Sequence, residues 1–362
     1  MKIDFANLQY QYQLYKDEID KAIHSVLDKS NYIMGEEIKE LEDSLKVFTG
    51  SSNAITCGSG TDALLLSLMA LDIKEGDEVI TTPFTFIATA ETIALVGATP
   101  VFVDIDSKTY NIDPSKIEEK ITNKTKAIMP VSLYGQPAEL DKIQDIANKY
   151  NLKVIIDGAQ SFGATYKGKT DSNLGTISIT SFFPAKPLGC FGDGGAVFTN
   201  DAELATKIKS LRVHGQSKRY HHSYVGLGAR LDTIQAAVLN VKLKHYKKDL
   251  VLRQEVASKY TKALESKELI TPYISKDSTS AFAQYSIRVK NRDKLQQKLK
   301  GLNIPTAVHY PIPLHLQECF TYLGYKKGSF PISELISQEI LSIPMNPYVS
   351  DEEIEYISKQ FL

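Results

Sequence analysis

Lys186 stands out because its neighbours restrict the backbone that carries it. It lies in the segment SFFPAKPLGCFGDGGAVFTN, residues 181–200, between Pro184 and Pro187. The two prolines disfavour a helix, and the glycines that follow permit tight turns into the next strand. A solvated surface lysine needs neither feature. The segment therefore predicts that Lys186 is held in a defined loop, where its amine is a candidate for chemistry.

A carboxylate and a small-residue turn follow other strand-like runs. Asp157 ends the apolar run at 154–156 and precedes GAQS. It could cap a helix, or it could face a cationic ring nitrogen in a charge-assisted hydrogen bond typically worth about 1.5–3 kcal/mol. In CGSGT, residues 57–61, backbone N–H groups are left free to face a phosphate, although a tight turn with a helix cap is the alternative. Since ligands of open parallel sheets bind beyond the carboxyl ends of strands, both segments are candidates for one site.

A third group mixes cationic and aromatic side chains. HGQSKRYHH occupies residues 214–222, and His309, Tyr310 and His315 follow later. Lys and Arg can neutralise a diphosphate, and tyrosine or imidazole can meet sugar hydroxyls, so this group suits a sugar nucleotide. A mobile basic surface loop is the alternative for residues 214–222. We expect no metal site, because the two adjacent histidines have no acidic or cysteine partner at ligand spacing.

A predicted sheet must position these segments. Short β-branched runs alternate in the first half of the chain with helix-like segments at 88–96 and 139–150. The runs are EVIT, VFVDID, KAIMPVSLYG, KVIIDGAQS, ISITSFF and GAVFTN. This alternation predicts an α/β fold with a mostly parallel sheet covered by helices. Two charged helix-like stretches, 17–28 and 36–48, precede a short strand-like step at 54–56.

Further helices are predicted beside the site and towards the C-terminus. Ser59 or Thr61 can cap a helix whose apolar face is formed by Leu64, Leu65, Leu68 and Met69. Residues 232–246, DTIQAAVLNVKLKHY, have the pattern of a long amphipathic helix. Beyond it the pattern is sparser and more charged, with SIRVKN, the basic helix RDKLQQKLKGL and the acidic helix DEEIEYISKQ. We therefore predict a large domain at 1–247 and a small α+β domain at 248–362.

Composition excludes several classes of protein. The chain has 362 residues, of which 43% are hydrophobic and 23% charged, as is usual for globular proteins. Its net charge of -1 supplies no global field for nucleic acid or anionic membranes. The N-terminal segment lacks a signal-peptide core, and no run of about 18 apolar residues occurs. Cys57, Cys190 and Cys319 are too few and too scattered for a disulfide framework or zinc knuckle. We expect a cytoplasmic protein without nucleic-acid or membrane partners.

The segment around Lys186 resembles the lysine segment of the DegT/DnrJ/EryC1/StrS family of sugar aminotransferases, because S-F-x-x-x-K-x-L-G is followed by G-D-G-G-A. The resemblance extends over essentially the whole chain, with several motifs in the family's order. They are GSGTDAL (58–64), PFTFIATAE (83–91), VFVDID (101–106), SLYGQ (132–136), DGAQSFGA (157–164), RLDTIQAA (230–237) and VHYPIPL (308–314). It implies an aspartate-aminotransferase-like fold of type I, pyridoxal 5′-phosphate as cofactor, and a homodimer whose chains share each active site.

The resemblance also implies roles for individual residues. Lys186 would hold the cofactor as a Schiff base, Asp157 would pair with its pyridinium nitrogen, and Gln160 would contact its ring hydroxyl. The other implied contacts are Phe86 and Ala159 on the two faces of the ring, and Gly60, Thr61 and Ser181 at the phosphate. Gly228 is a departure, since family members commonly carry there an Asn that reaches the phosphate across the dimer. Arg230 is then the remaining candidate from the partner subunit.

The implied reaction is transamination with L-glutamate as donor. Pyridoxamine 5′-phosphate forms as 2-oxoglutarate leaves, and the amine passes to a nucleotide-linked keto sugar. The motifs most resemble the enzymes that aminate UDP-2-acetamido-2-deoxy-3-oxo-glucuronate for bacterial surface polysaccharides, with a dTDP-3-oxo-6-deoxyhexose as the alternative substrate. His214, Arg230, His309 and Tyr310 would bind the substrate, and a uronate would give Arg230 or a histidine a carboxylate to hold.

Three other functions fit the residues less well. Sugar dehydratases on this scaffold replace the lysine with histidine, whereas this chain has Lys186. A regulatory member without catalysis would lose the chemistry, yet Asp157, Gln160 and Ser181 are all present. An unrelated nicotinamide enzyme would carry a strand-associated G-x-G-x-x-G motif, which this sequence lacks.

Overall fold

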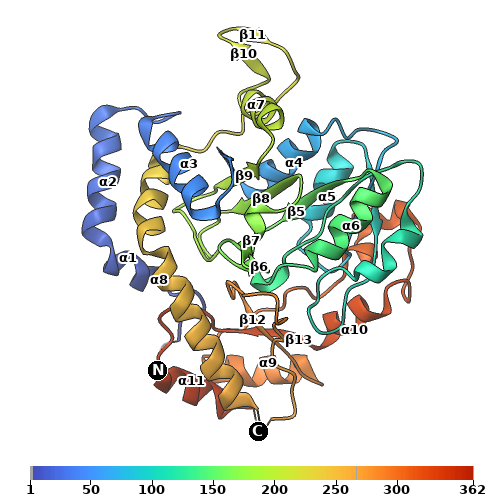
Figure 1. Cartoon of the computed structure of the whole chain (residues 1–362). Helices are drawn as coiled ribbons and strands as arrows, with labels where there is room; N and C mark the ends of the chain where they lie inside the picture. The colour runs from blue at the N-terminus through green and yellow to red at the C-terminus, as the bar shows by residue number, and fades with distance from the viewer. Residues whose placement is uncertain (1–2, 266, 362) are drawn as a thin grey trace.

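A seven-stranded sheet forms the centre of the molecule. The computed structural model describes residues 3–265 and 267–361, and its strands lie in the order β1-β9-β8-β5-β4-β2-β3 (Figure 1). Their bounds are β1 Asn53–Cys57, β9 Gly195–Thr199, β8 Ile177–Ser181, β5 Lys153–Asp157, β4 Thr125–Ile128, β2 Glu78–Thr81 and β3 Thr99–Phe102. Strand β9 is antiparallel to both its neighbours, and the other pairs are parallel. The predicted mostly parallel sheet is confirmed, and the carboxyl ends of all strands except β9 share one edge.

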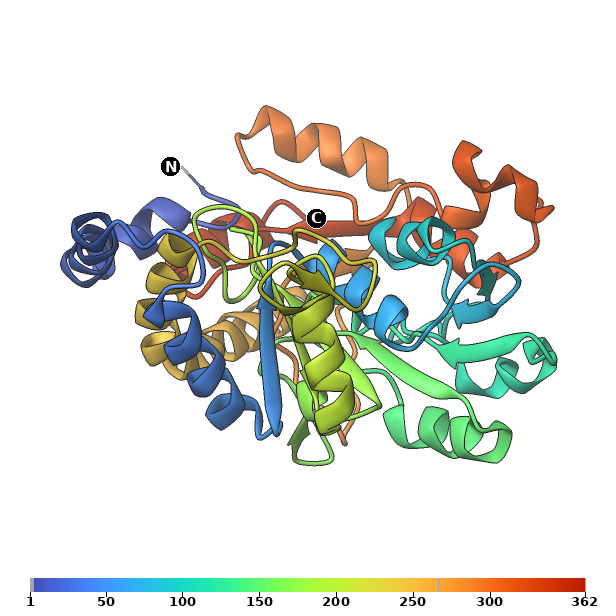
Figure 2. The ribbon, with the colours of Figure 1, turned by 90° about the horizontal axis from the view of Figure 1, so that it is seen from above.

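Helices cover both faces of this sheet (Figures 1 and 2). The helices of the large sheet region are α3 Glu36–Thr49, α4 Gly60–Ala70, α5 Ala88–Leu95, α6 Leu140–Tyr150, α7 Ala202–Leu211 and α8 Thr233–Leu264. Successive strand residues point to opposite faces. Accordingly, Ile155 packs in the core with α4, α5 and α7, whereas Val154 and Ile156 pack on the other face with α6. Helices α3 and α8 cover β1 and β9 on that second side.

Helix α4 begins as predicted but buries a different face. Ser59 caps it, because its Oγ accepts a hydrogen bond from the Asp62 amide at 2.9 Å. The predicted apolar face is partly wrong: Leu65 and Met69 are only partly buried, whereas Leu66 is fully buried. The reason is that α4 packs against α5 and α7 as well as against the sheet, so burial is not confined to one stripe.

Helix α8 is much longer than the predicted 232–246, so that end of the prediction is wrong. It continues to Leu264 because its C-terminal half buries Val256 and Tyr260 in a second core. Strand β12 Tyr285–Arg288 pairs antiparallel with β13 Ile340–Ile343 in the same core. The remaining C-terminal helices are α9 Arg292–Gly301, α10 Pro331–Glu339 and α11 Asp351–Ser358. The boundary predicted at residue 248 falls inside α8, and the division into domains at 1–247 and 248–362 stays a prediction.

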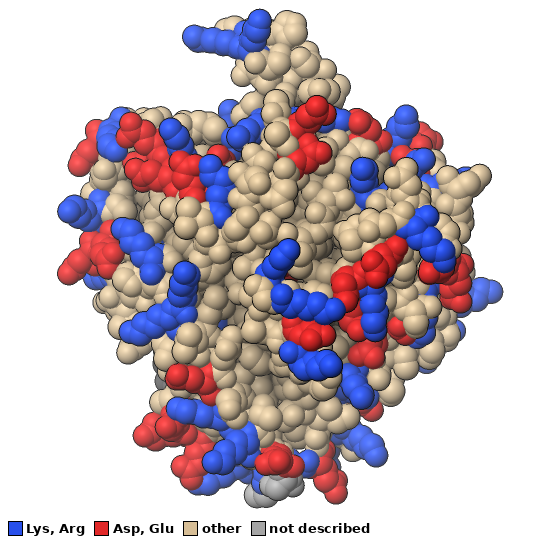
Figure 3. Space-filling view, viewed as in Figure 1, with Lys and Arg blue, Asp and Glu red and all other residues tan. Residues whose placement is uncertain are grey.

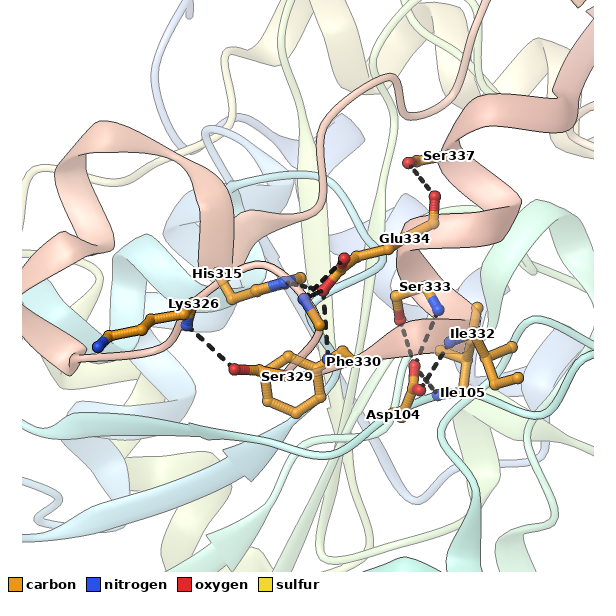
Figure 4. A network of polar contacts seen from close by, with 11 residues as sticks. Asp104, Ile105, His315, Lys326, Ser329, Phe330, Ile332, Ser333, Glu334 and Ser337 are labelled. Carbon is orange, nitrogen blue, oxygen red and sulfur yellow. Dashed lines mark hydrogen bonds and ion pairs between the residues drawn. The ribbon is translucent and has the colours of Figure 1, made fainter.

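Helix α10 is fastened to the main sheet by a network of polar contacts (Figure 4). The strand predicted at 101–106 is too long, since β3 ends at Phe102. Asp104 instead accepts hydrogen bonds from the Ile332 and Ser333 amides, both at 2.9 Å, at the start of α10. Next to it, Glu334 accepts from the buried His315 Nε2 at 3.0 Å. These contacts hold the C-terminal segment that includes His309 and Tyr310 against the sheet.

Two peripheral features complete the fold. Helices α1 Leu8–Leu14 and α2 Lys16–Lys29 come first, and α2 lies beside α8 (Figure 2). A hairpin of β10 Gln216–Lys218 and β11 His221–His222 projects from the body, with basic side chains at its tip (Figure 3). The short elements are β6 Thr165–Tyr166 and β7 Lys169–Thr170, with 3₁₀ helices at Pro114–Lys116, Glu118–Lys120, Leu133–Gly135, Asp171–Asn173, Leu314–Leu316 and Glu318–Leu323.

In the described parts of the chain, no helix has the length and apolarity to cross a membrane.

Candidate active site

Asp157 is fixed at the carboxyl end of the central strand β5. Its amide donates to the Pro130 carbonyl and its carbonyl accepts from the Ser132 amide, both at 2.9 Å. The side chain is only 4% exposed, and its two oxygens accept from Thr89 Oγ1 at 2.7 Å and from the Ala159 amide at 3.1 Å. Burial raises the pKa of this carboxyl, and the two hydrogen bonds oppose that shift.

Lys186 lies on the loop that connects β8 and β9. Its amide donates to the Phe183 carbonyl, and the Cys190 amide closes the loop onto the Phe182 carbonyl, both at 2.8 Å. Burial lowers the pKa of the Lys186 amine to about 8, although the negative charge of Asp157 opposes this. At pH 7 about a tenth of the amine is therefore uncharged and nucleophilic, far more than for an ordinary lysine.

Helix α8 supports this loop from behind. Gln235 Oε1 accepts from the Phe191 amide at 2.8 Å, and Lys242 Nζ donates to the Gly189 carbonyl at 2.6 Å. Lys242 is buried, and burial lowers the pKa of its amine to about 8 as well. The proline and glycine pattern that marked the loop in the sequence is thus matched by contacts that fix it.

Gln160 connects the sheet edge to the C-terminal segment. Its Oε1 accepts from the Tyr134 amide at 2.7 Å, and its Nε2 donates to the Tyr310 hydroxyl at 3.1 Å. Tyr134 in turn donates its hydroxyl to the His309 carbonyl. The side-chain nitrogen of glutamine has two hydrogens, and Tyr310 takes one, so Gln160 Nε2 keeps one hydrogen for a ligand.

Aromatic and imidazole groups lie over this part of the site. The Phe86 ring is 54% exposed, and its centroid lies 6.2 Å from that of Tyr310. His309 Nδ1 lies 2.9 Å from Ser342 Oγ. Burial first, and then the charge of Lys186, lowers the pKa of His309 to about 4, so its imidazole is neutral at pH 7.

The small-residue turn meets the end of β8. A Cβ atom on Gly60 would lie 2.8 Å from the Ser181 Cβ, so only glycine allows this approach. Gly60 and Thr61 are the first residues of α4, and the first amides of a helix have no acceptor within the helix. These amides and the Ser181 hydroxyl therefore suit an anionic group at the helix N-terminus.

His214, Gly228 and Arg230 form a second group near the Gly58 turn. The Gly58 amide donates to the Ala229 carbonyl at 3.0 Å, which brings this segment beside β1. A Cβ atom on Gly228 would lie 2.9 Å from His214 Cε1, so the imidazole occupies the space beside the glycine. Arg230 and His214 are both exposed. The residues predicted from the sequence thus fall into two groups. The first group is Asp157, Lys186, Gln160, His309 and Tyr310, with Phe86, Ala159, Gly60, Thr61 and Ser181 around it. The second group is His214, Gly228 and Arg230.

Two residues of the site are not predicted from the sequence. Thr89 lies in PFTFIATAE, where the resemblance implies a role for Phe86 alone, and its hydroxyl contacts Asp157. Tyr134 lies in SLYGQ and contacts both Gln160 and His309. The motifs contained both residues, but their contacts depend on how strands and loops meet.

The first group fits pyridoxal phosphate. Such a cofactor needs an amine for its aldehyde, an anion for its ring nitrogen and hydrogen-bond donors for its phosphate. Lys186, Asp157 and the Gly60 turn offer these three partners at one edge of the sheet. Among the described residues, no group of three or more His, Cys, Asp or Glu side chains could hold a metal ion.

Comparisons with known proteins agree with this site. The model of the DegT/DnrJ/EryC1/StrS aminotransferase family matches residues 13–362. The chain is 51% identical to a UDP-2-acetamido-2-deoxy-3-oxo-D-glucuronate aminotransferase of Pseudomonas aeruginosa, over 98% of each chain. It is 45% identical to a pleiotropic regulatory protein of Geobacillus stearothermophilus, over 99% of this chain and 97% of the other. It is 44% identical to a dTDP-3-amino-3,6-dideoxy-alpha-D-galactopyranose transaminase of Aneurinibacillus thermoaerophilus, over 98% and 97%.

A solved structure supports the fold and the cofactor. It is ntda from Bacillus subtilis with bound cofactor PMP, with a TM-score of 0.92 and 30% identity. The match covers 99% of this chain and 84% of that one. The predicted aspartate-aminotransferase-like architecture is therefore confirmed at the level of the family fold.

Proposed function

This chain belongs to the DegT/DnrJ/EryC1/StrS aminotransferase family, and we propose that it transfers the amino group of L-glutamate to carbon 3 of UDP-2-acetamido-2-deoxy-3-oxo-glucuronate. The family depends on pyridoxal phosphate. The observation that carries the proposal is the placement of Lys186 where its amine and the buried Asp157 carboxyl influence each other electrostatically, in a chain 51% identical to an aminotransferase of that name. A relative named for a dTDP sugar is less similar, at 44% identity.

Lys186 is the proposed catalytic residue. Pyridoxal phosphate, when bound, supplies an electron sink for the amino-acid carbon. Lys186 Nζ would hold the cofactor aldehyde and, when displaced by the donor amine, would carry a proton as general base and then as general acid. The pKa of about 8 places this amine close to neutrality, where it can both accept and donate a proton.

The other residues of the first group would bind and orient the cofactor. Asp157 would hold the proton on the ring nitrogen, and the free amide hydrogen of Gln160 would meet the ring hydroxyl. Phe86 and Ala159 would cover the ring. The phosphate would lie at the N-terminus of α4, with Gly60, Thr61 and Ser181 as its donors.

The substrate would be bound by groups from two chains. We infer a homodimer in which the exposed Arg230 and His214 serve the site of the partner subunit, with His214 filling the space beside Gly228. His309 and Tyr310 would contact the sugar from within the same chain. Cationic side chains on the projecting hairpin, Lys218 and Arg219, suit the diphosphate. The three free cysteines favour a reducing cytoplasm as the place of action.

Product analysis tests the substrate. The purified enzyme would be given L-glutamate with the UDP-linked 3-keto uronate, and separately with a dTDP-3-oxo-6-deoxyhexose. We expect mass spectrometry to find the amino sugar and 2-oxoglutarate in equal amounts with the UDP substrate. Turnover of the dTDP sugar alone would assign the enzyme to that substrate class, and turnover of neither would refute both substrate assignments.

A further inference from the structure

A chain of two threonine hydroxyls ends on the Asp157 carboxylate. Thr89 Oγ1 donates to Asp157 Oδ2 at 2.7 Å, and Thr85 Oγ1 lies 3.1 Å from Thr89 Oγ1. All three side chains are buried, with exposed fractions of 4% or less.

The direction follows from counting hydrogens. An ionised carboxylate only accepts, so the single hydroxyl hydrogen of Thr89 must point to Asp157. Thr85 must then donate to Thr89. Hydrogen bonds that reach the charged form of a group favour that form, and bonds in a chain polarise one another. The arrangement therefore supports the ionised Asp157 against the cost of its burial.

The local helix does not need the Thr89 hydroxyl. Thr89 lies in the first turn of α5, and Thr85 lies in the bend that precedes this helix. Thr92, nearly one turn further on and equally buried, directs its hydroxyl at the Ala88 carbonyl at 2.9 Å instead. That is the usual bond of a helical threonine to its own backbone. Thr89 does not make this bond, because its hydroxyl donates to Asp157 at the end of strand β5.

Other charged or titratable groups also face Asp157. The amine of Lys186, from the β8–β9 loop, favours the ionised carboxylate, and Tyr310, from the C-terminal segment, interacts with it electrostatically as well. In the working enzyme, however, the Lys186 amine would be joined to the cofactor aldehyde, so it would no longer stabilise the ionised Asp157 as a free ammonium group. The Thr89 bond and the Ala159 amide are the contacts that remain.

We propose that Thr89 is a positioning residue that keeps Asp157 ionised and directed at the cofactor ring nitrogen, with Thr85 orienting the Thr89 hydroxyl. The role at the ring nitrogen rests on the proposed function. The effect on Asp157 itself does not, because it concerns the protein without cofactor.

The test compares Thr89→Val, which keeps the shape and removes the hydroxyl, with Thr89→Ser, which restores it. Thr92→Val is the matched control on the same helix. In the cofactor-free full-length chain, the carboxyl carbon of Asp157 is followed by carbon-13 NMR against pH and assigned with Asp157→Asn. We expect Thr89→Val to move the titration midpoint up by about one pH unit, a tenfold change. Thr89→Ser and Thr92→Val should titrate like the parent. A Thr89→Val midpoint equal to the parent's would overturn the proposal.

A second measurement extends the test to the holoenzyme. With nitrogen-15 in the cofactor ring, the same variants report whether the ring nitrogen keeps its proton. We expect Thr89→Val to lose it at a pH about one unit below that of the parent enzyme and Thr89→Ser to keep it. If the carboxyl midpoint moves but the parent binds no cofactor, the proposed function fails while the Thr89–Asp157 coupling stands. If the titration midpoint of the Asp157 carboxyl shifts but the ring nitrogen loses its proton at the same pH as in the parent, the role of Thr89 towards the cofactor is refuted.

Discussion

Gln160 Nε2 donates a hydrogen bond of 3.1 Å to the Tyr310 hydroxyl, across 150 positions of the sequence. This bond joins the turn after the central strand to the C-terminal segment. Close by, the Leu314 amide donates to the Pro83 carbonyl at 2.7 Å, and Asp104 caps α10. The candidate site is thus built where the sheet edge and the C-terminal segment meet.

Replacing Tyr310 with Phe should weaken this junction. The ring contacts with Phe84 and Phe86 would remain, but the Gln160 amide would lose its acceptor. An unsatisfied, partly buried donor costs about 1–3 kcal/mol, so we expect urea unfolding to report a loss in this range. Tyr322→Phe, at a side chain 64% exposed, serves as the control and should leave stability unchanged. Equal stability of both variants would argue against a structural role for the bond.

The amine of Lys186 should titrate well below an ordinary lysine. Burial lowers its pKa to about 8, so in the cofactor-free chain its reaction with trinitrobenzenesulfonate should rise with a midpoint near pH 8. The negative charge of Asp157 raises this pKa, and Asp157→Asn should therefore shift the midpoint to lower pH. The rate of modification of the peptide that contains Lys186 is measured by mass spectrometry at each pH. A midpoint near the ordinary value of 10.5, or an upward shift in Asp157→Asn, would contradict this electrostatic account.

The residues of the site that come directly after a strand in the chain could be predicted from the sequence. Asp157 and the Lys186 loop were found because strand ends and prolines leave local patterns. Thr89 was missed because its hydroxyl bonds to another element, whereas helical threonines usually bond to their own backbone, as Thr92 does. The end of α8 was missed for a similar reason, since the core that buries Tyr260 is made by β12 and β13.

The turn that meets Ser181 should tolerate only glycine at position 60. In Gly60→Ala the new Cβ would lie 2.8 Å from the Ser181 Cβ, so the N-terminus of α4 or the end of β8 must shift. Such overpacking costs about 1–3 kcal/mol, and we expect a lower melting temperature together with at least tenfold weaker cofactor binding. Gly301→Ala, where a Cβ meets open space, is the control for equilibrium dialysis and calorimetry. Unchanged cofactor affinity in Gly60→Ala would remove this turn from the phosphate site.

Mixed dimers test whether Arg230 serves the partner's site. Lys186→Ala and Arg230→Ala are each expected to be nearly inactive alone. In a mixed dimer, one site would combine both defects, while the other would have an intact Lys186 and an intact Arg230 from the partner. Random mixing in equal amounts should therefore restore about a quarter of the parent activity, because half the dimers are mixed and each has one good site. No gain on mixing would mean that Arg230 acts within its own chain.

The central claim is a covalent bond between the Lys186 amine and the cofactor aldehyde, and borohydride reduction followed by peptide mapping tests it most directly. We expect one pyridoxyl group per chain, on the peptide that contains Lys186, and none after Lys186→Ala. Lys242 is the internal control, because burial lowers its pKa to about 8 as well. A reduced adduct on Lys242 or elsewhere, or no adduct at all, would contradict the account.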